Sequence, residues 1–152
     1  MPEQQDPRAY SGSQAGSLEE ILKEFSLELP SCEPEKVGFS GNATFPGQKL
    51  NLSFRAPKRC VDSFLAEHQV DVADPAHWPS GGGRDGDRVI SPTEPPFVEK
   101  DMKRFGWKLD PSREYNFYDS FKTANGSLFR VLIDPRDAVQ TVYMVSTTVG
   151  GG

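Results

Sequence analysis

The chain has two cysteines, Cys32 and Cys60, and their chemistry is the easiest to specify. A bond between their sulfur atoms would close a loop of about 28 residues, which in the chain-entropy model stabilises a fold by roughly 3 to 4 kcal/mol. Two unpaired core thiols are the alternative, since free cysteine is a common buried residue. Neither cysteine stands in a Cys-x-x-Cys motif, so a redox-active role is not favoured. A disulfide would indicate an oxidising compartment.

The two histidines, His68 and His77, share one acidic segment with Asp71 and Asp74. Imidazole nitrogens and carboxylate oxygens bind divalent metals, so these four residues are the candidate metal site. Their spacing matches no established metal-binding motif, and His68 could simply end a helix, where a positive charge interacts favourably with the helix dipole. A solvated acidic loop is the favoured interpretation, and no metal or other cofactor is predicted.

Nucleophilic catalysis finds little support in the sequence. A serine nucleophile would need one of the two histidines as its base, and neither histidine lies near a Gly-x-Ser-x-Gly or related motif. The 22 acidic residues form pairs by chance, so such pairs do not indicate glycoside hydrolysis. We expect a protein that is not an enzyme, with a small hydrolase or metal-binding enzyme as the weaker alternative.

Four aromatic residues are candidates for a surface that binds a ligand or partner: Trp78, Trp107, Tyr118 and Tyr143. Tyrosine and tryptophan combine an apolar ring with a polar group, which suits contacts with peptides or sugars. Alternation places Tyr118 and Tyr143 on the face opposite their core-directed neighbours. Such residues more often cover a core beneath long loops, so both interpretations stay open.

Charge limits the possible partners. The chain has 17 basic and 22 acidic residues, and the basic residues are scattered rather than aligned. Nucleic acid is therefore not an expected partner. No apolar run approaches the roughly 18 residues that cross a bilayer, so we expect no membrane insertion. An acidic surface could instead attract a basic protein, as in a cytoplasmic immunity or inhibitor protein; its candidate residues are Asp71, Asp74, Asp85 and Asp87.

The 152 residues divide into a tail, one domain and a short glycine end. Residues 1–16 are polar, which predicts a flexible tail. Residues 17–149 have the size and composition of a single domain, and 150–152 are glycine. Within the domain, residues 69–94 are rich in Asp, Pro, Gly and Ser, which predicts a long loop.

Three segments have helical periodicity. A capping box begins at Ser17, and the stretch that follows turns into a strand over 25–29. Pro57 suits the first turn of a second helix, which has a single apolar stripe. A third helix is predicted to end at Gly106.

Alternating apolar and polar residues predict a hairpin over 37–55, with its turn at 46–47. In that register Phe39 lies opposite Phe54, and one face is apolar while the other is solvated. Three further strands are predicted nearer the C-terminus, over 114–123, 128–133 and 139–148. The middle one is apolar on both faces. Because strands and helices do not alternate regularly, the pattern predicts an α+β domain. We expect a mostly antiparallel sheet of about five to six strands, two or three short helices packed on one face, and a long central loop.

Short motifs spread over roughly residues 25–148 are shared with a known kind of domain. They are Leu29-Pro30-x-Cys32, the hairpin, Cys60-Val61-x-x-Phe64-Leu65, Trp107, and Val131-Leu132-Ile133-Asp134 ahead of Thr141-Val142-Tyr143. Together they resemble small extracytoplasmic or lipoprotein-type domains of high-GC Gram-positive (actinobacterial) bacteria. The resemblance implies that Cys32 and Cys60 are paired, and it supplies no activity. The chain departs from the pattern in showing no signal peptide, lipid-attachment cysteine or membrane helix.

The sequence thus predicts a non-enzymatic binding or interaction module, held together by a disulfide. We expect it outside the cytoplasm or at the cell surface, on a flexible N-terminal tether, with an unknown protein or small ligand as its partner. The cytoplasmic immunity protein is the first alternative.

Overall fold

The structure, a computed structural model, has an α+β fold built on a six-stranded antiparallel sheet. It describes residues 9–10, 17–30, 32, 34–42, 49–68, 70, 76–78, 84–85, 88–89, 97, 99–110, 112, 114–124, 126–135 and 137–148. The strand order in the sheet is β1-β2-β8-β7-β6-β3, and β4 pairs with β5 in a separate small sheet. The predicted class and the mostly antiparallel sheet are confirmed.

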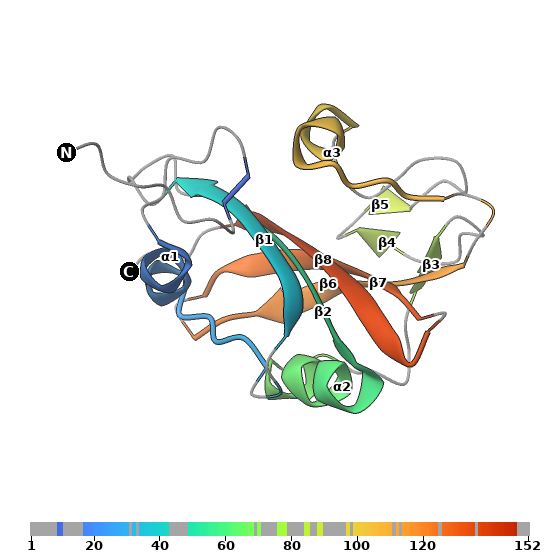
Figure 1. Ribbon diagram of the computed structural model, residues 1–152, viewed down its shortest axis with the longest axis horizontal. Helices are drawn as coiled ribbons and strands as arrows, with labels where there is room; N and C mark the ends of the chain where they lie inside the picture. Colours follow the sequence, from blue (N-terminus) through green and yellow to red (C-terminus); the bar gives the residue numbers. More distant parts are fainter. Residues whose placement is uncertain are drawn as a thin grey trace.

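The elements follow one another along the chain as shown in Figure 1. In order they are α1 (Leu18–Glu24), β1 (Glu35–Asn42), β2 (Lys49–Pro57), α2 (Lys58–Glu67), β3 (Ala76–Trp78), β4 (Arg84–Asp85), β5 (Arg88–Val89), α3 (Glu99–Phe105), β6 (Tyr115–Lys122), β7 (Leu128–Asp134) and β8 (Val139–Thr148). The described residues therefore contain more strands than predicted. The additional ones are β3, β4 and β5, which lie within 69–94 and are too short to leave a periodic signal in the sequence.

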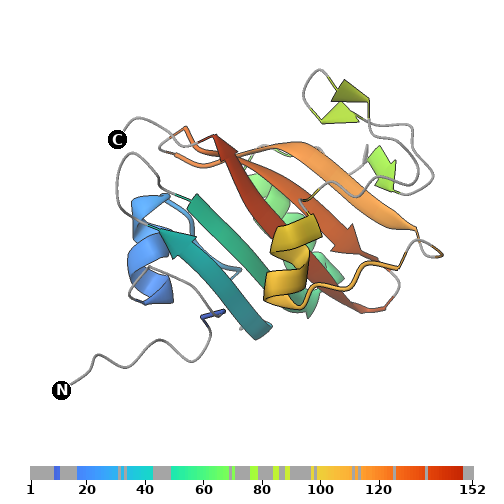
Figure 2. The ribbon, with the colours of Figure 1, turned by 90° about the horizontal axis from the view of Figure 1, so that it is seen from above.

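Helices cover both faces of the sheet (Figures 1 and 2). The apolar residues of α1 and α2 form one cluster with residues such as Val131 and Ile133 of β7. α3 lies over the other face, in a second cluster that includes Leu132 and Trp107. β7 is thus buried on both faces, as predicted. The prediction that all helices pack on one face is wrong, because the central strands carry apolar side chains on both sides and each side needs its own cover.

α1 begins as its sequence predicts but is not followed by a strand. The Ser17 hydroxyl accepts a hydrogen bond from the Glu20 N–H at 3.2 Å, so the predicted cap is confirmed. After the helix, the Leu27 N–H donates to the Leu22 carbonyl at 2.9 Å. This bond ends the helix and removes Leu27 from any sheet ladder. The predicted strand over 25–29 is therefore wrong, although alternate side chains there are buried.

α2 and α3 agree more closely with the sequence. Pro57 is the last residue of β2 and also the N-cap of α2, and Gly106 follows α3 with a φ of 73°. The buried stripe of α2 is the predicted one, made of Cys60, Val61, Phe64 and Leu65. Within the described part of the chain, no helix is long and apolar enough to cross a membrane.

β1 and β2 form the predicted hairpin, with a register shifted by two residues. Phe39 lies opposite Leu52 rather than Phe54. A shift of two leaves every side chain on its predicted face, because the side-chain period of a strand is two. The predicted turn at 46–47 lies outside the described residues.

The polar face of this hairpin is buried, which corrects the prediction of a solvated face. Ser40 is 3%, Asn51 is 2% and Ser53 is 8% exposed. They lie on the face opposite Phe39 and Leu52, which belong to the α1–α2 cluster, and the Tyr10 hydroxyl contacts Ser53 there. A pattern of small polar residues indicates only that a face is not packed with large apolar side chains, and tertiary structure decides whether water reaches it.

The three C-terminal strands form the predicted meander. β6 pairs with β7 and β7 with β8, both antiparallel, and β8 closes the sheet against β2. Gly126, in the turn between β6 and β7, has a φ of 88°, and its N–H donates to the Thr123 carbonyl at 2.9 Å. These strands place the ends of β2, β7 and β8 side by side, which is where the candidate site lies.

Candidate functional site

Cys32 and Cys60 are joined by a disulfide, with their Cα atoms 6.3 Å apart. Cys32 is exposed and lies in the connection between α1 and β1, whereas Cys60 is 4% exposed on the inner side of α2. The pairing is confirmed, and the alternative of two unpaired thiols is wrong. The bond fastens the α1–β1 connection to α2 and leaves no thiol for chemistry.

His68 ends α2, as one interpretation of the sequence predicts. Its Nδ1 atom lies 2.9 Å from the Phe64 carbonyl oxygen, and its ring stacks on Phe121 with centroids 4.3 Å apart. The ring is half-buried between the helix and β6. The local contacts thus give His68 a packing role.

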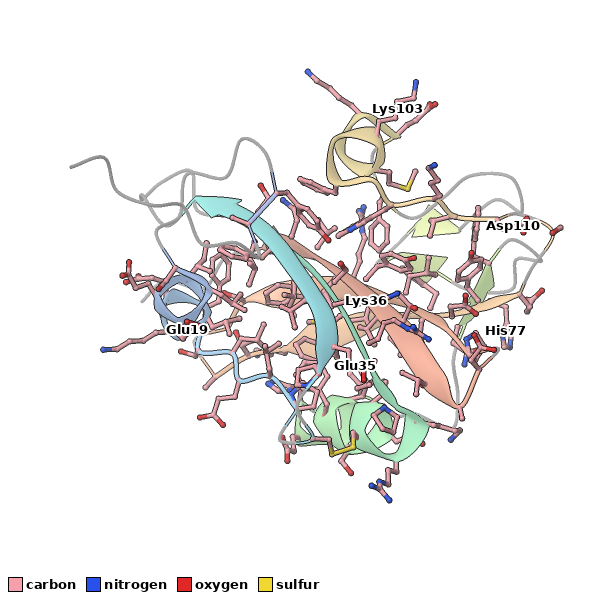
Figure 3. All side chains as sticks on the ribbon, viewed as in Figure 1. Glu19, Glu35, Lys36, His77, Lys103 and Asp110 are labelled. Carbon is pink, nitrogen blue, oxygen red and sulfur yellow. A yellow bond between two sulfur atoms is a disulfide. The ribbon has the colours of Figure 1, made fainter. Side chains whose placement is uncertain are left out.

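The described residues do not bring the candidate metal ligands together. His77 lies in β3, where its Nδ1 atom is 3.8 Å from the Glu114 carboxylate. Asp71 and Asp74 lie outside the described residues. Within the part of the chain that is described, no group of three or more His, Cys, Asp or Glu side chains could hold a metal ion. Figure 3 shows His77 at the opposite end of the molecule from Glu19 of α1.

The four aromatic candidates are divided between the two faces of the sheet. Trp107 and Tyr143 meet, with ring centroids 5.2 Å apart. Trp78 is in the same cluster but packs on Tyr115 and is 2% exposed. Tyr118 belongs to the α1–α2 cluster on the other face of the sheet, so it lies apart from the other three. Only Trp107 and Tyr143 share one place.

Tyr10, from the N-terminal segment, lies beside Trp107 and is held there through its backbone. The Tyr10 N–H donates to the Phe39 carbonyl at 2.6 Å, and Ala9 forms a parallel bridge with Phe39. β1 is the outer strand of the sheet, so this pairing uses its open edge. The sequence assigns 1–16 to a flexible tail, whereas Ala9 and Tyr10 lie against the sheet; the rest of that range lies outside the described residues.

The Tyr10 side chain fills a socket that four residues form, Gly38, Ser53, Phe105 and Trp107, which we call the Tyr10 socket. The ring stacks on Phe105 with centroids 5.1 Å apart. The Trp107 indole N–H donates to the Tyr10 hydroxyl at 2.9 Å, and this hydroxyl also contacts the Ser53 hydroxyl. A Cβ atom on Gly38 would lie 2.5 Å from the Tyr10 ring, so only glycine leaves room for it.

An open pocket of about 450 Å³ lies beside the socket. Its aromatic wall consists of Tyr10, Phe105, Trp107 and Tyr143. Its charged residues are Lys36, Arg55, Asp134 and Asp137. We call it the aromatic–ionic pocket.

The strand register explains why opposite charges meet in this pocket. Thr141 of β8 lies opposite Arg55 of β2 on one side and opposite Asp134 of β7 on the other. The two charged residues are therefore two strands, or about 10 Å, apart. Arg55 donates through Nη2 to the Val139 carbonyl at 3.5 Å, while its buried Nε has no hydrogen-bond partner among the described residues. A ligand with both donors and acceptors could contact both charges.

Lys36 adds a cation from a distorted part of β1. Its φ is 50°, which is unusual for a residue with a side chain, and the ladder with β2 is irregular between Glu35 and Gly38. Such backbone conformations cost about 1 to 3 kcal/mol and cluster at binding sites, because they re-aim a side chain. Figure 3 labels Lys36 beside β1, near the middle of the view.

A second open cleft, of about 740 Å³, lies between α1 and α2. Its carboxylates, Glu19, Glu28 and Glu67, are all exposed, and its buried members are leucines of the core. It offers neither a buried polar group nor a strained charged residue. The aromatic–ionic pocket is therefore the better candidate, although the cleft between α1 and α2 is larger.

Sequence reasoning missed most of this pocket. Tyr10 is the sole aromatic residue of 1–16, and Gly38 interrupts a strand, which often marks a close approach of another chain segment. These two signals could have indicated the socket. Lys36, Arg55 and Asp134 left no signal, because they come from three separate strands.

No family model, curated protein or solved structure matches the chain.

Proposed function

We propose that the protein is a non-enzymatic binding module and that the aromatic–ionic pocket is its binding site. The observation that carries the proposal is the composition of that pocket, in which aromatic rings in mutual contact lie beside side chains of both charges. Sites of this kind bind small polar ligands or peptide segments, because rings supply contact area and charges supply orientation.

The proposed location is outside the cytoplasm. Disulfides persist in oxidising compartments and are rare in the cytosol, and this chain has one between its only two cysteines. The resemblance to extracytoplasmic domains of actinobacterial type supports the same location. The cytoplasmic immunity protein depends on Asp71, Asp74, Asp85 and Asp87, whose side chains lie outside the described ones, so the geometry adds nothing to that alternative.

The test is a titration of the full, oxidised, ¹⁵N-labelled chain with defined probes, followed by amide chemical shifts. The probes are single N-acetyl amino acid amides of each charge class and common monosaccharides, at millimolar concentration. At least one should shift the amides of Lys36, Gly106 and Thr141 in a saturable manner. In Arg55→Gln or Asp134→Asn, affinity for that probe should fall about tenfold or more, because a charge-assisted hydrogen bond is lost; Asp134→Asn also keeps the size of the side chain.

Lys103→Gln is the matched control. Lys103 also carries a positive charge on α3, but it is exposed and points away from the sheet (Figure 3). This substitution should leave the affinity unchanged. Absence of saturable shifts around the pocket across the whole panel would contradict the proposed site.

A further inference from the structure

We propose that the Tyr10 socket is a recognition site for a tyrosine carried on an extended peptide, and that Tyr10 is its intramolecular occupant. The inference deepens the proposed function and rests on it, because Ser53, Phe105 and Trp107 belong to both the socket and the aromatic–ionic pocket, and Tyr10, the occupant of the socket, also lines that pocket. The occupant already present in the site shows what chemistry the site accepts.

The first argument is the backbone. Ala9 and Tyr10 add to the outer edge of β1 in parallel, through the bridge to Phe39 and the bond from the Tyr10 N–H to its carbonyl. An open edge strand accepts any extended segment in this way, since main-chain groups do not depend on sequence. The edge therefore supplies affinity for an extended chain, and the side-chain socket supplies selectivity.

The second argument is the way the phenol is recognised. An indole N–H can only donate, so the Tyr10 oxygen accepts from Trp107 and can donate its own proton to Ser53. Both partners are buried, with Trp107 at 7% and Ser53 at 8% exposure. A phenylalanine in the socket would leave these two groups unpaired, which sites of this kind reject strongly.

The third argument is shape. The Tyr10 ring stacks on Phe105 at a 25° interplanar angle, and it lies against the bare backbone of Gly38. No side chain larger than hydrogen fits at Gly38 while a ring is in place. The shape of the socket therefore depends on the absence of a side chain at Gly38.

The fourth argument distinguishes a binding site from ordinary core packing. Around Tyr10, residues 1–8 and 11–16 contain no Val, Ile, Leu, Phe or Trp, so Tyr10 carries the one aromatic ring of this stretch of sequence. A tyrosine on an extended segment of another chain offers the same backbone groups and the same ring, so it can compete with Tyr10 for the edge and the socket. The aromatic–ionic pocket beside the ring then offers Lys36, Arg55 and Asp134 to the residues that flank the incoming tyrosine.

The experiment uses the full, oxidised chain with Tyr10→Ala, which empties the socket. The probe is the acetylated and amidated tetrapeptide Ala-Tyr-Ser-Gly, which copies residues 9–12. Binding is measured by calorimetry and by the indole N–H resonance of Trp107. We expect saturable binding to Tyr10→Ala and at least tenfold weaker binding to the wild-type chain, whose own tyrosine competes. The peptide with phenylalanine in place of tyrosine should bind at least tenfold more weakly.

Gly38→Ala provides the matched control. In the Tyr10→Ala background it fills the empty socket, so it should abolish peptide binding while leaving thermal stability unchanged or higher. In the wild-type background it should displace Tyr10 and move the Trp107 indole resonance toward its position in Tyr10→Ala. If Tyr10→Ala does not fold, Tyr10→Phe replaces it, and the tyrosine peptide should then displace the resident ring.

Failure of the peptide to bind a folded Tyr10→Ala chain, with the Trp107 resonance shifted, would overturn the proposal and leave Tyr10 as a structural anchor. Equal affinity for the tyrosine and phenylalanine peptides would overturn it as well. The proposed function is judged separately, by the response of Arg55→Gln and Asp134→Asn to the small probes. The two can therefore fail independently.

Discussion

At the scale of single residues, two helix ends share one geometry but not one residue type. After α1, the Ser26 N–H donates to the Lys23 carbonyl at 3.1 Å, and after α3 the Gly106 N–H donates to Lys103 at 3.3 Å. Ser26 has a φ of 54° and Gly106 a φ of 73°, and the residue that follows each closes a second bond back to the helix. This left-handed position favours glycine, so the chain uses the better residue at one end only.

Exchanging these residues should change stability in opposite directions. Ser26→Gly should raise the free energy of unfolding by about 1 kcal/mol or less, because serine's strained conformation is relieved. Gly106→Ser should lower it by about 1 kcal/mol, since a Cβ on Gly106 meets no atom within 4 Å and only backbone strain is added. Urea unfolding of both variants measures this. Destabilisation by both would contradict the shared geometry.

Gly38 shows a different reason for glycine. Its φ is not in the left-handed region, but a Cβ would collide with Tyr10. The sequence shows that Gly38 interrupts a strand and that Tyr10 is the one aromatic of its segment. Nothing local connects the two, because their meeting depends on how the chain crosses the sheet.

At the scale of elements, local sequence patterns predict where helices and strands begin and end better than they predict how helices cover the sheet. The cap at Ser17, the stripe of α2 and the parity of the β1–β2 hairpin all follow from side chains a few residues apart. The short polar face of that hairpin was predicted to be solvated and is buried. At Ser53 the cover comes from a distant segment, because the Tyr10 hydroxyl, 43 positions away along the chain, contacts the Ser53 hydroxyl.

A matched pair of substitutions tests this burial. Ser40→Lys places a charge on the covered face of β1, where Ser40 is 3% exposed, and should lower the free energy of unfolding by roughly 3 to 5 kcal/mol because the charge is buried without a partner. Ser63→Lys makes the same exchange on the exposed face of α2 and should change stability by about 0.5 kcal/mol or less. Thermal and urea unfolding compare the two. Similar stability of both variants would mean that the face is solvated after all.

At the scale of the whole molecule, the disulfide links two parts of the fold that the sheet does not join directly. The α1–β1 connection and α2 meet through Cys32 and Cys60 across a sequence separation of 28 residues. Closing such a loop restricts the unfolded chain, which raises the free energy of unfolding by about 3.6 kcal/mol in the chain-entropy model. This is a large share of the net stability of a domain of this size.

Removing the bond should therefore lower the melting temperature. For Cys32→Ser/Cys60→Ala we expect a fall of roughly 7 to 14 °C, as a loss of this size implies for about 150 residues. Dithiothreitol should produce a similar fall in the wild-type chain and none in the variant, which is the control. A thiol assay of denatured, unreduced protein from an oxidising compartment should find no free thiol. Two free thiols there would show that the bond does not form.

The sequence by itself determined what depends on near neighbours: the cap at Ser17, the glycine that ends α3, the side-chain parity of the strands and the α+β class. It also indicated the disulfide and placed Trp107 and Tyr143 among the binding candidates. Tertiary structure alone decided that helices cover both faces, that Tyr118 and Trp78 are buried, and that Tyr10 completes the site. The reason is physical, because caps and periodicity arise from contacts within a few residues, whereas the pocket brings Lys36, Arg55, Asp134 and Tyr10 together from distant segments through strand order and register.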